Sequence, residues 1–541
     1  MKKIGLIAVL SVMVCSAWAV PARRGGIVKT QPDGSQITVY QHGDEHFRWM
    51  TNEKGEWLKV DEDGFYQVTE ALSAEQIEAK RMAAPSRLAQ AQKAATPLNI
   101  APRGLVILVN FTDVAFTTDK AELDSMLLGK NYTRDYSYTY NLRNYHITSE
   151  GSAREYFYDS SNGHYDPQFD VIGPVTVSKN MAYYGKNIYD FDAAPWTMVK
   201  EACQLVDDSV DFKQYDNNND GYVDFVYVIY AGYGEADGGS ANTIWPHSYW
   251  LLDAGITCKV DGKYVDLYAC GNELDYFSKQ HTGIGTFCHE FSHVLGLPDL
   301  YTTEGQTHKT LGSWDILDYG PYNNDGNTPP AYSAYERFMM GWLTPRLIVD
   351  AENVELAELK ASNSALLISS SDQHNLIGND PKPTTFYLLE NRQQVGWDEY
   401  LPGHGLMLTK VQYSSNSWLQ NTVNNSSNRM GVDLIEADGK KPSSGSNGYA
   451  GKAGDLFPAG ATEYLGITDH SIEEISEKDG VIYFKYKGGV ATSSTEQVLQ
   501  QATIIAIYNI LGQKQTTTDI ESLPRGTYVL VTTAGNKKIV H

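Results

Sequence analysis

Cysteine is scarce in this chain, with five among 541 residues and none between residues 20 and 202. The segment between residues 20 and 202 therefore has no thiolate to offer a metal ion. The four later cysteines allow two disulfides in three possible pairings, and the sequence does not choose among them. They are Cys203, Cys258, Cys270 and Cys288.

Basic side chains are also few: 43 Lys and Arg face 66 Asp and Glu, which gives a formal net charge of −23. Such a balance argues against nucleic acid or an anionic membrane as a partner, and it predicts a solvated acidic surface. After the N-terminus no apolar run is long enough to span a bilayer, so we expect no transmembrane segment.

The first 19 residues are typical of a secretory signal. Lys2 and Lys3 precede the apolar run Ile4–Val14, and the small-x-small site Ala17–Ala19 lies directly before Val20. We therefore expect a secreted or cell-surface protein.

The most informative motif is H-E-x-x-H-x-x-G-x-x-D, at residues 289–299. On a helix, His289 and His293 lie four residues apart on one face and can bind one zinc ion. Glu290 is then placed as the general base for water. Gly296 permits a sharp turn that returns Asp299 as the third ligand. Three protein ligands with one open position are typical of catalytic rather than structural zinc.

The residues around this motif add candidates. The turn Gly283–Thr286 precedes the expected helix, with Thr286 as its candidate cap. Asp315 competes with Asp299 for the place of third ligand, although Gly296 favours Asp299. A tyrosine near the metal can donate to a developing oxyanion. Tyr319 is the first candidate for this role, followed by Tyr332 and Tyr335, while His247 is expected either to orient substrate or to be structural.

The segment Asp216–Asp224 is rich in oxygen ligands and has a glycine at its sixth position. This spacing matches the first part of a calcium loop but lacks the glutamate that would complete an EF-hand. The sequence predicts a structural calcium site here, and an Asn/Asp-rich turn capped by its own side chains is the alternative. The calcium ligands would be Asp216, Asn218, Asp220, Tyr222 and Asp224.

Hydrophobic patterning predicts an α/β (α+β) catalytic domain between an N-terminal propeptide and C-terminal β-sandwich domains; that this domain is a metzincin-like zinc protease is what the family resemblance described below implies. Strands are expected at Arg103–Phe111 and Asp224–Ala231, with a helix near Trp196–Val206 between them. Further strands are expected at Thr385–Arg392 and Gly405–Val411, with long loops at 413–428 and 442–454. The expected boundaries are 1–19 for the signal peptide, 20–98 for the propeptide, 99–345 for the catalytic domain, 346–489 for the β-sandwich and 490–541 for a C-terminal module.

The segment 20–98 combines short strands with an Ala- and Gln-rich helical stretch at 73–93. Exported proteases are commonly kept inactive by such a module, so we expect the propeptide to inhibit its own enzyme. If it blocks the metal, the candidate ligands are His42, Asp44, Glu45 and His46.

These residues together resemble the immune-inhibitor-A-like metalloproteases, secreted bacterial relatives of the metzincins. The resemblance implies zinc on His289, His293 and Asp299, catalysis by Glu290, calcium-stabilised loops and an N-terminal propeptide. One departure is Leu317, which stands where metzincin-like enzymes carry a methionine beneath the zinc. The matching segments are Tyr183–Gly185, Asp216–Asp224, Ile244–His247, His289–Asp299, Gly312–Asp315, Gly341–Leu343, Glu390–Arg392 and Gly454–Pro458.

The last fifty residues resemble the C-terminal sorting domain of proteins exported by the type IX system of Bacteroidota. Ile507–Gln513, Leu523–Val529 and the closing basic stretch Lys537–Val540 carry this similarity. A simple C-terminal β module is the alternative.

The sequence as a whole predicts a secreted zinc endopeptidase that acts on protein or peptide substrates. One alternative is a non-catalytic calcium-dependent adhesin or glycan-binding protein with a structural or vestigial metal site. A second is an amidase or de-N-acylase that uses the same zinc chemistry. Neither the cleavage specificity nor the oligomeric state follows from the sequence.

Overall fold

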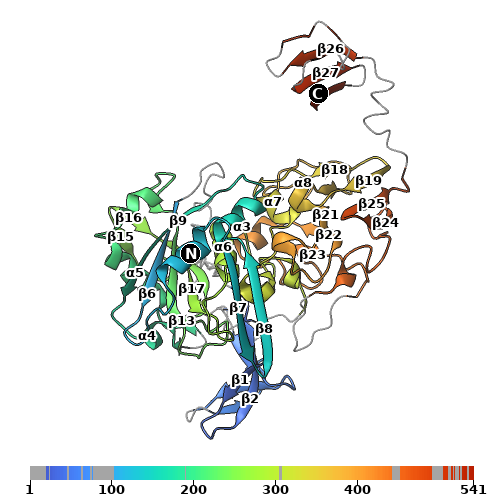
Figure 1. Ribbon diagram of the computed structural model, residues 1–541. Coiled ribbons are helices and arrows are strands. Elements are labelled where there is room, and N and C mark those ends of the chain that lie inside the picture. Colours follow the sequence, from blue (N-terminus) through green and yellow to red (C-terminus); the bar gives the residue numbers. More distant parts are fainter. Residues whose placement is uncertain are drawn as a thin grey trace, which may run out of the picture.

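The fold was analysed in a computed structural model (Figure 1). The structure describes residues 20–440 and 451–489, together with parts of 504–540. Within the first range, residue 24 and the segments 45–47, 62–64, 74–75, 77–102, 189–190 and 304–307 are left out. The predicted signal peptide and the predicted helical stretch at 73–93 therefore lie wholly or mostly outside the described residues.

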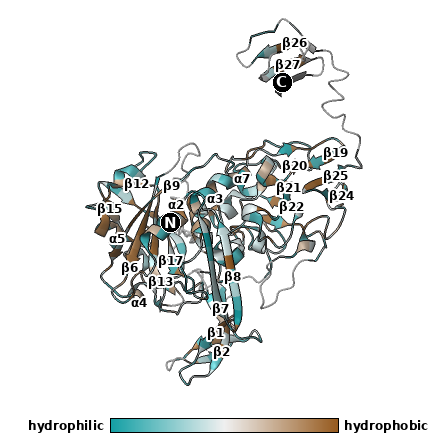
Figure 2. Ribbon diagram, viewed as in Figure 1, coloured by the Kyte–Doolittle hydropathy of each residue, from teal (hydrophilic) through white to brown (hydrophobic). Residues whose placement is uncertain are grey.

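The predicted catalytic region, residues 99–345, is built on a five-stranded sheet of order β14-β17-β13-β6-β9. Strands β6 (Arg103–Asn110), β9 (Gln168–Thr176), β13 (Val226–Tyr233) and β17 (Leu267–Leu274) run parallel, and β14 (His247–Trp250) pairs antiparallel at one edge. The central strands are apolar along their length (Figure 2), because a parallel sheet is covered on both faces. The predicted strands at 103–111 and 224–231 are confirmed as β6 and β13.

Helices cover this sheet, and the predicted helix near 196–206 is α5 (Pro195–Val206). The most buried helix is α6 (Gly285–Val294), which carries the metal motif and in which every residue except Thr286 is buried. Its aromatic residues Phe287 and Phe291 pack on Phe169 of β9 at ring distances of 5.1 and 5.2 Å. The apolar face of this helix thus anchors the histidines to the sheet.

The remaining elements of this region are short. They are α2 (Lys120–Leu128), β7 (Thr133–Tyr140), β8 (Arg143–Glu150), α3 (Ala153–Ser160), α4 (Met181–Gly185), β10 (Asn187–Ile188), β11 (Phe191–Asp192), η1 (Phe212–Tyr215), β12 (Tyr222–Val223), β15 (Cys258–Val260), β16 (Lys263–Val265), η2 (Gly312–Trp314), η3 (Gly320–Gly326) and α7 (Ala334–Met339).

The N-terminal module is an antiparallel five-stranded sheet of consecutive strands. Figure 1 shows the long β7–β8 hairpin of the catalytic region reaching this sheet. There the Tyr140 hydroxyl accepts a hydrogen bond of 3.0 Å from the Val28 amide. The five strands are β1 (Ile27–Thr30), β2 (Gln36–Gly43), β3 (Arg48–Thr51), β4 (Trp57–Val60) and β5 (Tyr66–Val68).

Two further sheets follow the catalytic region, of order β18-β20-β21-β22-β23 and β19-β25-β24. Both contribute to one apolar cluster, in which Leu389 and Leu408 of the first sheet pack with Ile482 and Phe484 of the second. The predicted strands at 385–392 and 405–411 are confirmed. The elements are β18 (Arg346–Leu347), β19 (Glu352–Leu356), α8 (Leu359–Ser362), β20 (Leu366–Ile368), β21 (Thr385–Arg392), η4 (Gly396–Asp398), β22 (Gly405–Gln412), α9 (Ser415–Leu419), β23 (Val432–Leu434), η5 (Ala453–Asp455), β24 (Ile472–Lys478) and β25 (Val481–Tyr486).

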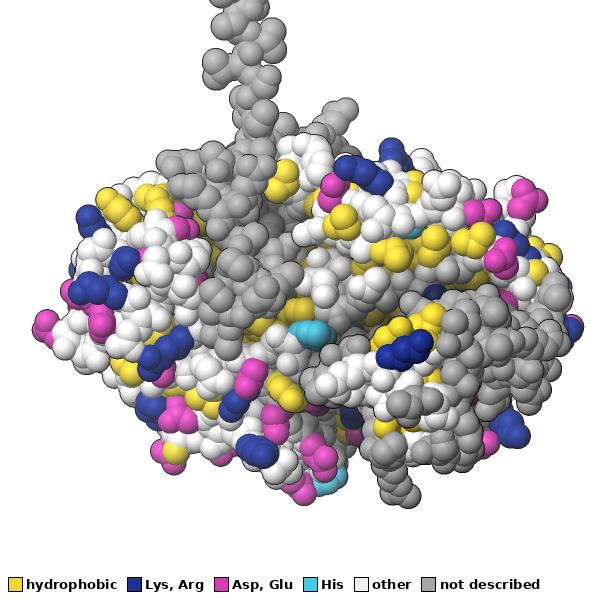
Figure 3. Space-filling view, turned by 90° about the horizontal axis from the view of Figure 1, so that it is seen from above, with side chains coloured by type: hydrophobic (Ala, Val, Ile, Leu, Met, Phe, Trp, Pro, Cys, Tyr) yellow, Lys and Arg dark blue, Asp and Glu magenta, His cyan; other side chains and the backbone are white. Residues whose placement is uncertain are grey.

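The C-terminal module contains the antiparallel strands β26 (Ile504–Asn509), β27 (Thr527–Thr532) and β28 (Gly535–Val540). Among the described residues, no helix is both long enough and apolar enough to cross a bilayer. On the face of the molecule in Figure 3, acidic and basic side chains are interspersed wherever residues are described.

Candidate metal centre

Three side chains of the predicted motif meet at one buried point. The two Nε2 atoms of His289 and His293 lie 3.1 Å apart, and Asp299 Oδ1 lies 3.2 Å and 3.3 Å from them. All three side chains are fully buried or nearly so. Within the described part of the chain, this is the one group of three or more such side chains whose ligand atoms converge closely enough to hold a metal ion.

The chain orients both imidazoles through their other nitrogen. His289 Nδ1 lies 2.7 Å from the carbonyl oxygen of Ile316, and His293 Nδ1 lies 2.8 Å from that of Leu297. A carbonyl can only accept, so each Nδ1 carries the proton and each Nε2 presents a lone pair to the centre. The Ile316 carbonyl therefore orients His289, and the adjacent Leu317 is fully buried.

Asp299 is held by a residue that the sequence did not single out. The Asn421 side-chain amide donates to Asp299 Oδ2 at 2.6 Å, and Asn421 Oδ1 accepts from the Asp299 amide at 2.7 Å. The loop predicted at 413–428 in fact contains the short helix α9, and Asn421 follows its end. Only its position after a Ser- and Asn-rich stretch hinted at a capping role.

The geometry fits a metal ion. The carboxylate oxygen Asp299 Oδ1 is buried and has no hydrogen-bond donor, which is costly unless a cation satisfies it. Ligand atoms at the corners of a tetrahedron with bonds of roughly 2.0–2.1 Å lie about 3.3 Å apart. The three distances of 3.1, 3.2 and 3.3 Å match this spacing.

Gly296 makes the return of Asp299 possible. Its φ is +91°, and the amides of Gly296 and Leu297 bond the carbonyls of His293 and Ser292, which closes α6 with a Schellman motif. The prediction for Gly296 is thus confirmed. The prediction for Thr286 was wrong: α6 begins at Gly285, and its N-cap Ile284 offers no side-chain hydrogen bond.

Two glycines, Gly283 and Gly285, stand at the start of α6 where a capping side chain was expected. A Cβ at Gly283 would lie 2.1 Å from the Gly326 carbonyl oxygen, and one at Gly285 would lie 1.9 Å from that of Pro321. The backbone of η3 can therefore pack directly on the start of α6, and this close approach brings η3 side chains to the metal centre.

Glu290 is fully buried, and its Oε1 accepts a hydrogen bond of 2.9 Å from the backbone nitrogen of Val20. The first described residues of the chain thus lie in the candidate site. The Trp245 indole donates to the Val20 carbonyl at 3.0 Å, and the Tyr322 hydroxyl donates to the Pro21 carbonyl at 2.7 Å. Val20 and Ala22 are buried with Trp245 in one apolar cluster.

The N-terminal segment also places two arginines against acidic side chains of the catalytic region. Arg23 pairs with Asp237, Asp275 and Asp325, and Arg48 pairs with Asp192 and Glu235 at 2.9 and 3.1 Å. Asp237 and Glu235 belong to the glycine-rich loop 232–239, which therefore contacts the N-terminal segment.

The candidate latency ligands fall partly within the described residues. His42 Nε2 lies 2.8 Å from the Thr51 hydroxyl within the N-terminal sheet, and it is Val20 that meets Glu290. Asp44 is buried, while Glu45 and His46 lie outside the described residues.

The tyrosines predicted to stabilise an oxyanion lie in different environments. Tyr332 and Tyr335 are core residues, hydrogen-bonded to Ser292 at 2.5 Å and to Trp418 at 2.8 Å. Tyr319 is partly buried at the start of η3, and its amide donates to Gly312. The phenol placed beside the Val20–Pro21 segment is that of Tyr322, which the sequence did not single out.

His247 and Asp315 both lie in structural positions. His247 bonds the Trp245 carbonyl and the Tyr268 hydroxyl at 2.7 and 2.8 Å. Asp315 accepts from the Leu317 amide at 2.8 Å, and burial together with Glu336 raises its pKa well above the usual value. The structure therefore brings Asp299, and not Asp315, to the two histidines.

The calcium candidates form a turn held by its own hydrogen bonds. Asp216 accepts from the amides of Asp220 and Gly221, both at 3.0 Å, and from the Lys263 ammonium at 2.5 Å. Asn218 and Asp220 accept amides within the turn, and Asp224 accepts from Asn217. Calcium at this turn remains a prediction, and the Lys263 ammonium competes with it for Asp216.

The four cysteines are buried and reduced in the structure. The thiols of Cys203 and Cys258 hydrogen-bond to each other, and this contact is the first cause of the lowered pKa of Cys258. Cys288 on α6 is buried away from solvent, and burial raises the pKa of its thiol well above the usual value. Such a thiol is not poised for nucleophilic chemistry.

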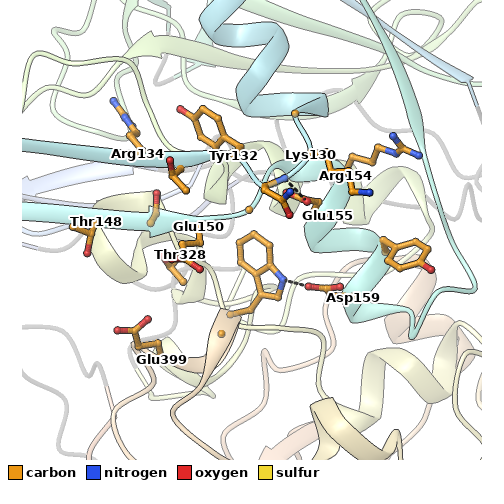
Figure 4. Close-up of a pocket in the computed structure, with 18 of the residues that line it drawn as sticks. Lys130, Tyr132, Arg134, Thr148, Glu150, Arg154, Glu155, Asp159, Thr328 and Glu399 are labelled. Carbon is orange, nitrogen blue, oxygen red and sulfur yellow. Dashed lines mark hydrogen bonds between the residues drawn. The ribbon is translucent and has the colours of Figure 1, made fainter.

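A separate hollow of about 1240 Å³ lies at the base of the β7–β8 hairpin (Figure 4). Its wall includes Trp397, whose indole donates to Asp159 at 3.0 Å, and Lys130 and Arg154 lie at its edge. None of the metal-centre residues lines it.

Residues 99–343 match the family model described as Immune inhibitor A peptidase M6, catalytic domain. The chain is 29% identical over 240 residues to the Pre-pro-metalloprotease PrtV of Vibrio cholerae serotype O1 (strain M66-2), which covers 39% of this chain and 26% of that protein. It is 27% identical over 214 residues to Immune inhibitor A of Bacillus thuringiensis subsp. alesti, covering 33% of this chain and 30% of that protein. The chain thus spans under a third of the length of these relatives. The matched family segment includes His289, Glu290, His293 and Asp299.

Proposed function

We propose that this chain is a zinc-dependent endopeptidase whose metal is held by His289, His293 and Asp299. The observation that carries the proposal is the convergence of these three buried side chains at distances of 3.1–3.3 Å, with Glu290 next to His289 on the same helix. The similarity of residues 99–343 to a peptidase catalytic domain supports peptide bonds as the substrate.

The chemistry divides between the metal and the chain. When bound, zinc supplies the Lewis acidity that polarises water and the scissile carbonyl. Glu290 takes a proton from the attacking water and returns it to the leaving nitrogen. The Val20 contact supports this role, because a backbone nitrogen already lies 2.9 Å from Glu290 Oε1. Tyr319 was the first candidate to stabilise the oxyanion, and Tyr322 is the alternative that its position favours.

The test is chelator-sensitive cleavage of casein by the zinc-loaded protein and by Glu290→Ala. We expect the variant to lose at least about a hundredfold in kcat, the scale of general base catalysis, while it keeps stoichiometric zinc. Ser313→Ala, a partly buried position in η2, is the matched control and should retain activity. Full activity of the Glu290 variant would refute the role of Glu290.

Absence of chelator-sensitive proteolysis in the wild-type protein would refute the endopeptidase itself. Glycan or matrix binding would then favour the adhesin, and hydrolysis of non-protein amides would favour the de-N-acylase.

The segment 20–98 is proposed to act as an inhibitory propeptide. Support comes from Val20 against Glu290 and from the ion pairs of Arg48 with Asp192 and Glu235. Arg48→Ala should loosen the module and shorten the lag before activity appears, whereas Lys54→Ala, at an exposed turn, should leave the lag unchanged. Equal lags in the two variants would reject this docking role.

Export to the cell surface or medium is proposed from residues 1–19 and from the C-terminal module. Type IX sorting of residues 490–541 predicts that deletion of this module retains the protein inside the cell. Fractionation of cells that express the truncated and full chains, followed by immunoblotting, tests it; normal export of the truncated chain would reject the sorting role.

A further inference from the structure

Three aspartates of the catalytic region converge on one guanidinium. Arg23 Nη1 lies 2.8 Å from Asp237 Oδ1 and also contacts Asp275, and Arg23 Nη2 lies 2.7 Å from Asp325 Oδ1. Asp237 follows β13, Asp275 follows β17 and Asp325 belongs to η3, so the carboxylates come from three separate segments. Arg23 comes from the N-terminal segment and is only 9% exposed.

Aromatic rings complete the pocket. The Arg23 guanidinium carbon lies 4.5 Å from the centre of the Phe277 ring and 5.9 Å from that of Tyr322. A planar guanidinium can stack on such faces while its edges bond carboxylates, which an ammonium does less well. The pocket is therefore shaped for arginine first and lysine second.

The carboxylates are held in place by groups of the catalytic region. Asp275 Oδ1 accepts the amides of Phe277 and Ser278 at 3.0 and 2.6 Å. Asp237 Oδ2 accepts the amide of Tyr276 at 3.2 Å, and Asp325 accepts the Tyr138 hydroxyl. These bonds do not involve the N-terminal segment, so the pocket does not depend on Arg23 for its shape.

Without Arg23, the three carboxylates of the pocket would lie close together with no positive charge to pair with them. Buried like charges at close range are costly unless they are paired. Burial and the charge of Asp275 raise the pKa of Asp237 to about 7, so the ionised form of Asp237 is costly in this pocket. Once the N-terminal segment leaves, a side chain of opposite charge restores the pairing.

The N-terminal segment that fills the pocket indicates where the pocket lies relative to the bond that would be cleaved. The Val20 nitrogen lies where Glu290 would protonate a leaving amine. The Val20 carbonyl accepts a hydrogen bond from the Trp245 indole, and the Pro21 carbonyl accepts one from the Tyr322 hydroxyl. The Arg23 amide then donates to the Ala236 carbonyl at 2.9 Å. The segment is bound as the carboxyl-terminal product of a cut peptide would be, with Val20 as its first residue and Arg23 as its fourth.

We propose that Asp237, Asp275 and Asp325 form a substrate subsite that selects arginine, and less strongly lysine, at the fourth residue after the cleaved bond. The inference rests on the proposed endopeptidase function. It assigns a sequence preference to the proposed active site. It also implies that the N-terminal segment occupies the position of a bound substrate.

The experiment uses the zinc-loaded chain, produced at full length and matured, with fluorogenic peptides that differ only at the fourth residue after the cut. We expect kcat/KM to be roughly ten- to a hundredfold higher for arginine than for glutamine, as a buried charge-assisted hydrogen bond implies, with lysine between them. As a second readout, the peptide Val-Pro-Ala-Arg should inhibit casein cleavage at least about tenfold more strongly than Val-Pro-Ala-Gln.

Variants of Asp325 test the pocket directly, because its side chain is the most exposed of the three at 21%. Asp325→Asn should reduce the arginine-to-glutamine ratio, and Asp325→Lys should shift the preference toward glutamate. Asp135→Asn, at a side chain 73% exposed, is the matched control and should keep the wild-type ratio.

The outcomes distinguish a failure of the endopeptidase proposal from a failure of the arginine subsite. If no peptide is cut in a chelator-sensitive manner, the endopeptidase proposal fails. If peptides are cut without a preference for arginine, or with the preference at another position, the subsite is wrong. If calcium abolishes the preference in the wild-type protein, the pocket is a cation site and the subsite is again wrong.

Discussion

Asn421 and Asp299 form a closed pair of hydrogen bonds, in which the Asn421 amide donates to Asp299 Oδ2 at 2.6 Å and Asn421 Oδ1 accepts from the Asp299 amide at 2.7 Å. The two residues are 122 positions apart in the chain. This pairing leaves Asp299 Oδ1 directed at the histidines. The segment after β22 therefore supports the metal centre although it contributes no ligand.

Asn421→Ala is expected to weaken zinc retention by roughly 10- to 100-fold, the usual effect of removing a group that orients a ligand. Competition with a zinc chelator measures it. Asn425→Ala is the matched control, because Asn425 bonds Thr303 from the same loop without touching Asp299. Equal zinc loss in both variants would indicate loop destabilisation instead.

Calcium is expected to bind the Asp216–Asp224 turn weakly, because the Lys263 ammonium is held by Asp216 at 2.5 Å. Lys263→Gln should therefore tighten calcium binding, which calorimetric titration measures. Lys259→Gln, an exposed position on the neighbouring strand β15, should not. No calcium-dependent heat in any of the three proteins would reject the site.

Acid is expected to destabilise the N-terminal sheet through His42. Burial, followed by the charge of Lys309, lowers the pKa of His42 to about 4 from its ordinary 6.5. The neutral imidazole is thus favoured in the folded state, and its stability contribution is complete above pH 6.5 and lost as the pH falls toward 4. The loss amounts to about 3 kcal/mol.

Hydrogen exchange of the β2 and β3 amides between pH 7 and 4.5 measures this effect. His42→Gln should flatten the dependence, because it removes the titrating group. Unchanged protection in the wild-type protein over this range would contradict the role of His42.

Oxidation is expected to join Cys203 and Cys258, since their thiols already hydrogen-bond to each other. Closing this loop would stabilise the protein by about 4 kcal/mol in the chain-entropy picture. Alkylation under denaturing conditions should then find Cys270 and Cys288 reactive, and peptide mapping should find the 203–258 link. Cys203→Ser should release the Cys258 thiol, whereas a link involving Cys288 would contradict the pairing.

Much of the fold could be predicted because its signals are local. The apolar runs of β6 and β13 and the spacing of the motif on α6 each depend on a few neighbouring residues. The cap of α6 could not be predicted, because the backbone of η3 packs against Gly285 and occupies the space of a capping side chain.

The sequence by itself determined the two histidines, Glu290 and the turn at Gly296, since helical periodicity and a positive φ are properties of one short segment. Only the tertiary structure decided that Asn421 orients Asp299, that Tyr322 contacts the Pro21 carbonyl, and that three distant aspartates surround Arg23. Those contacts join residues more than a hundred positions apart, and the packing of separate elements brings them together.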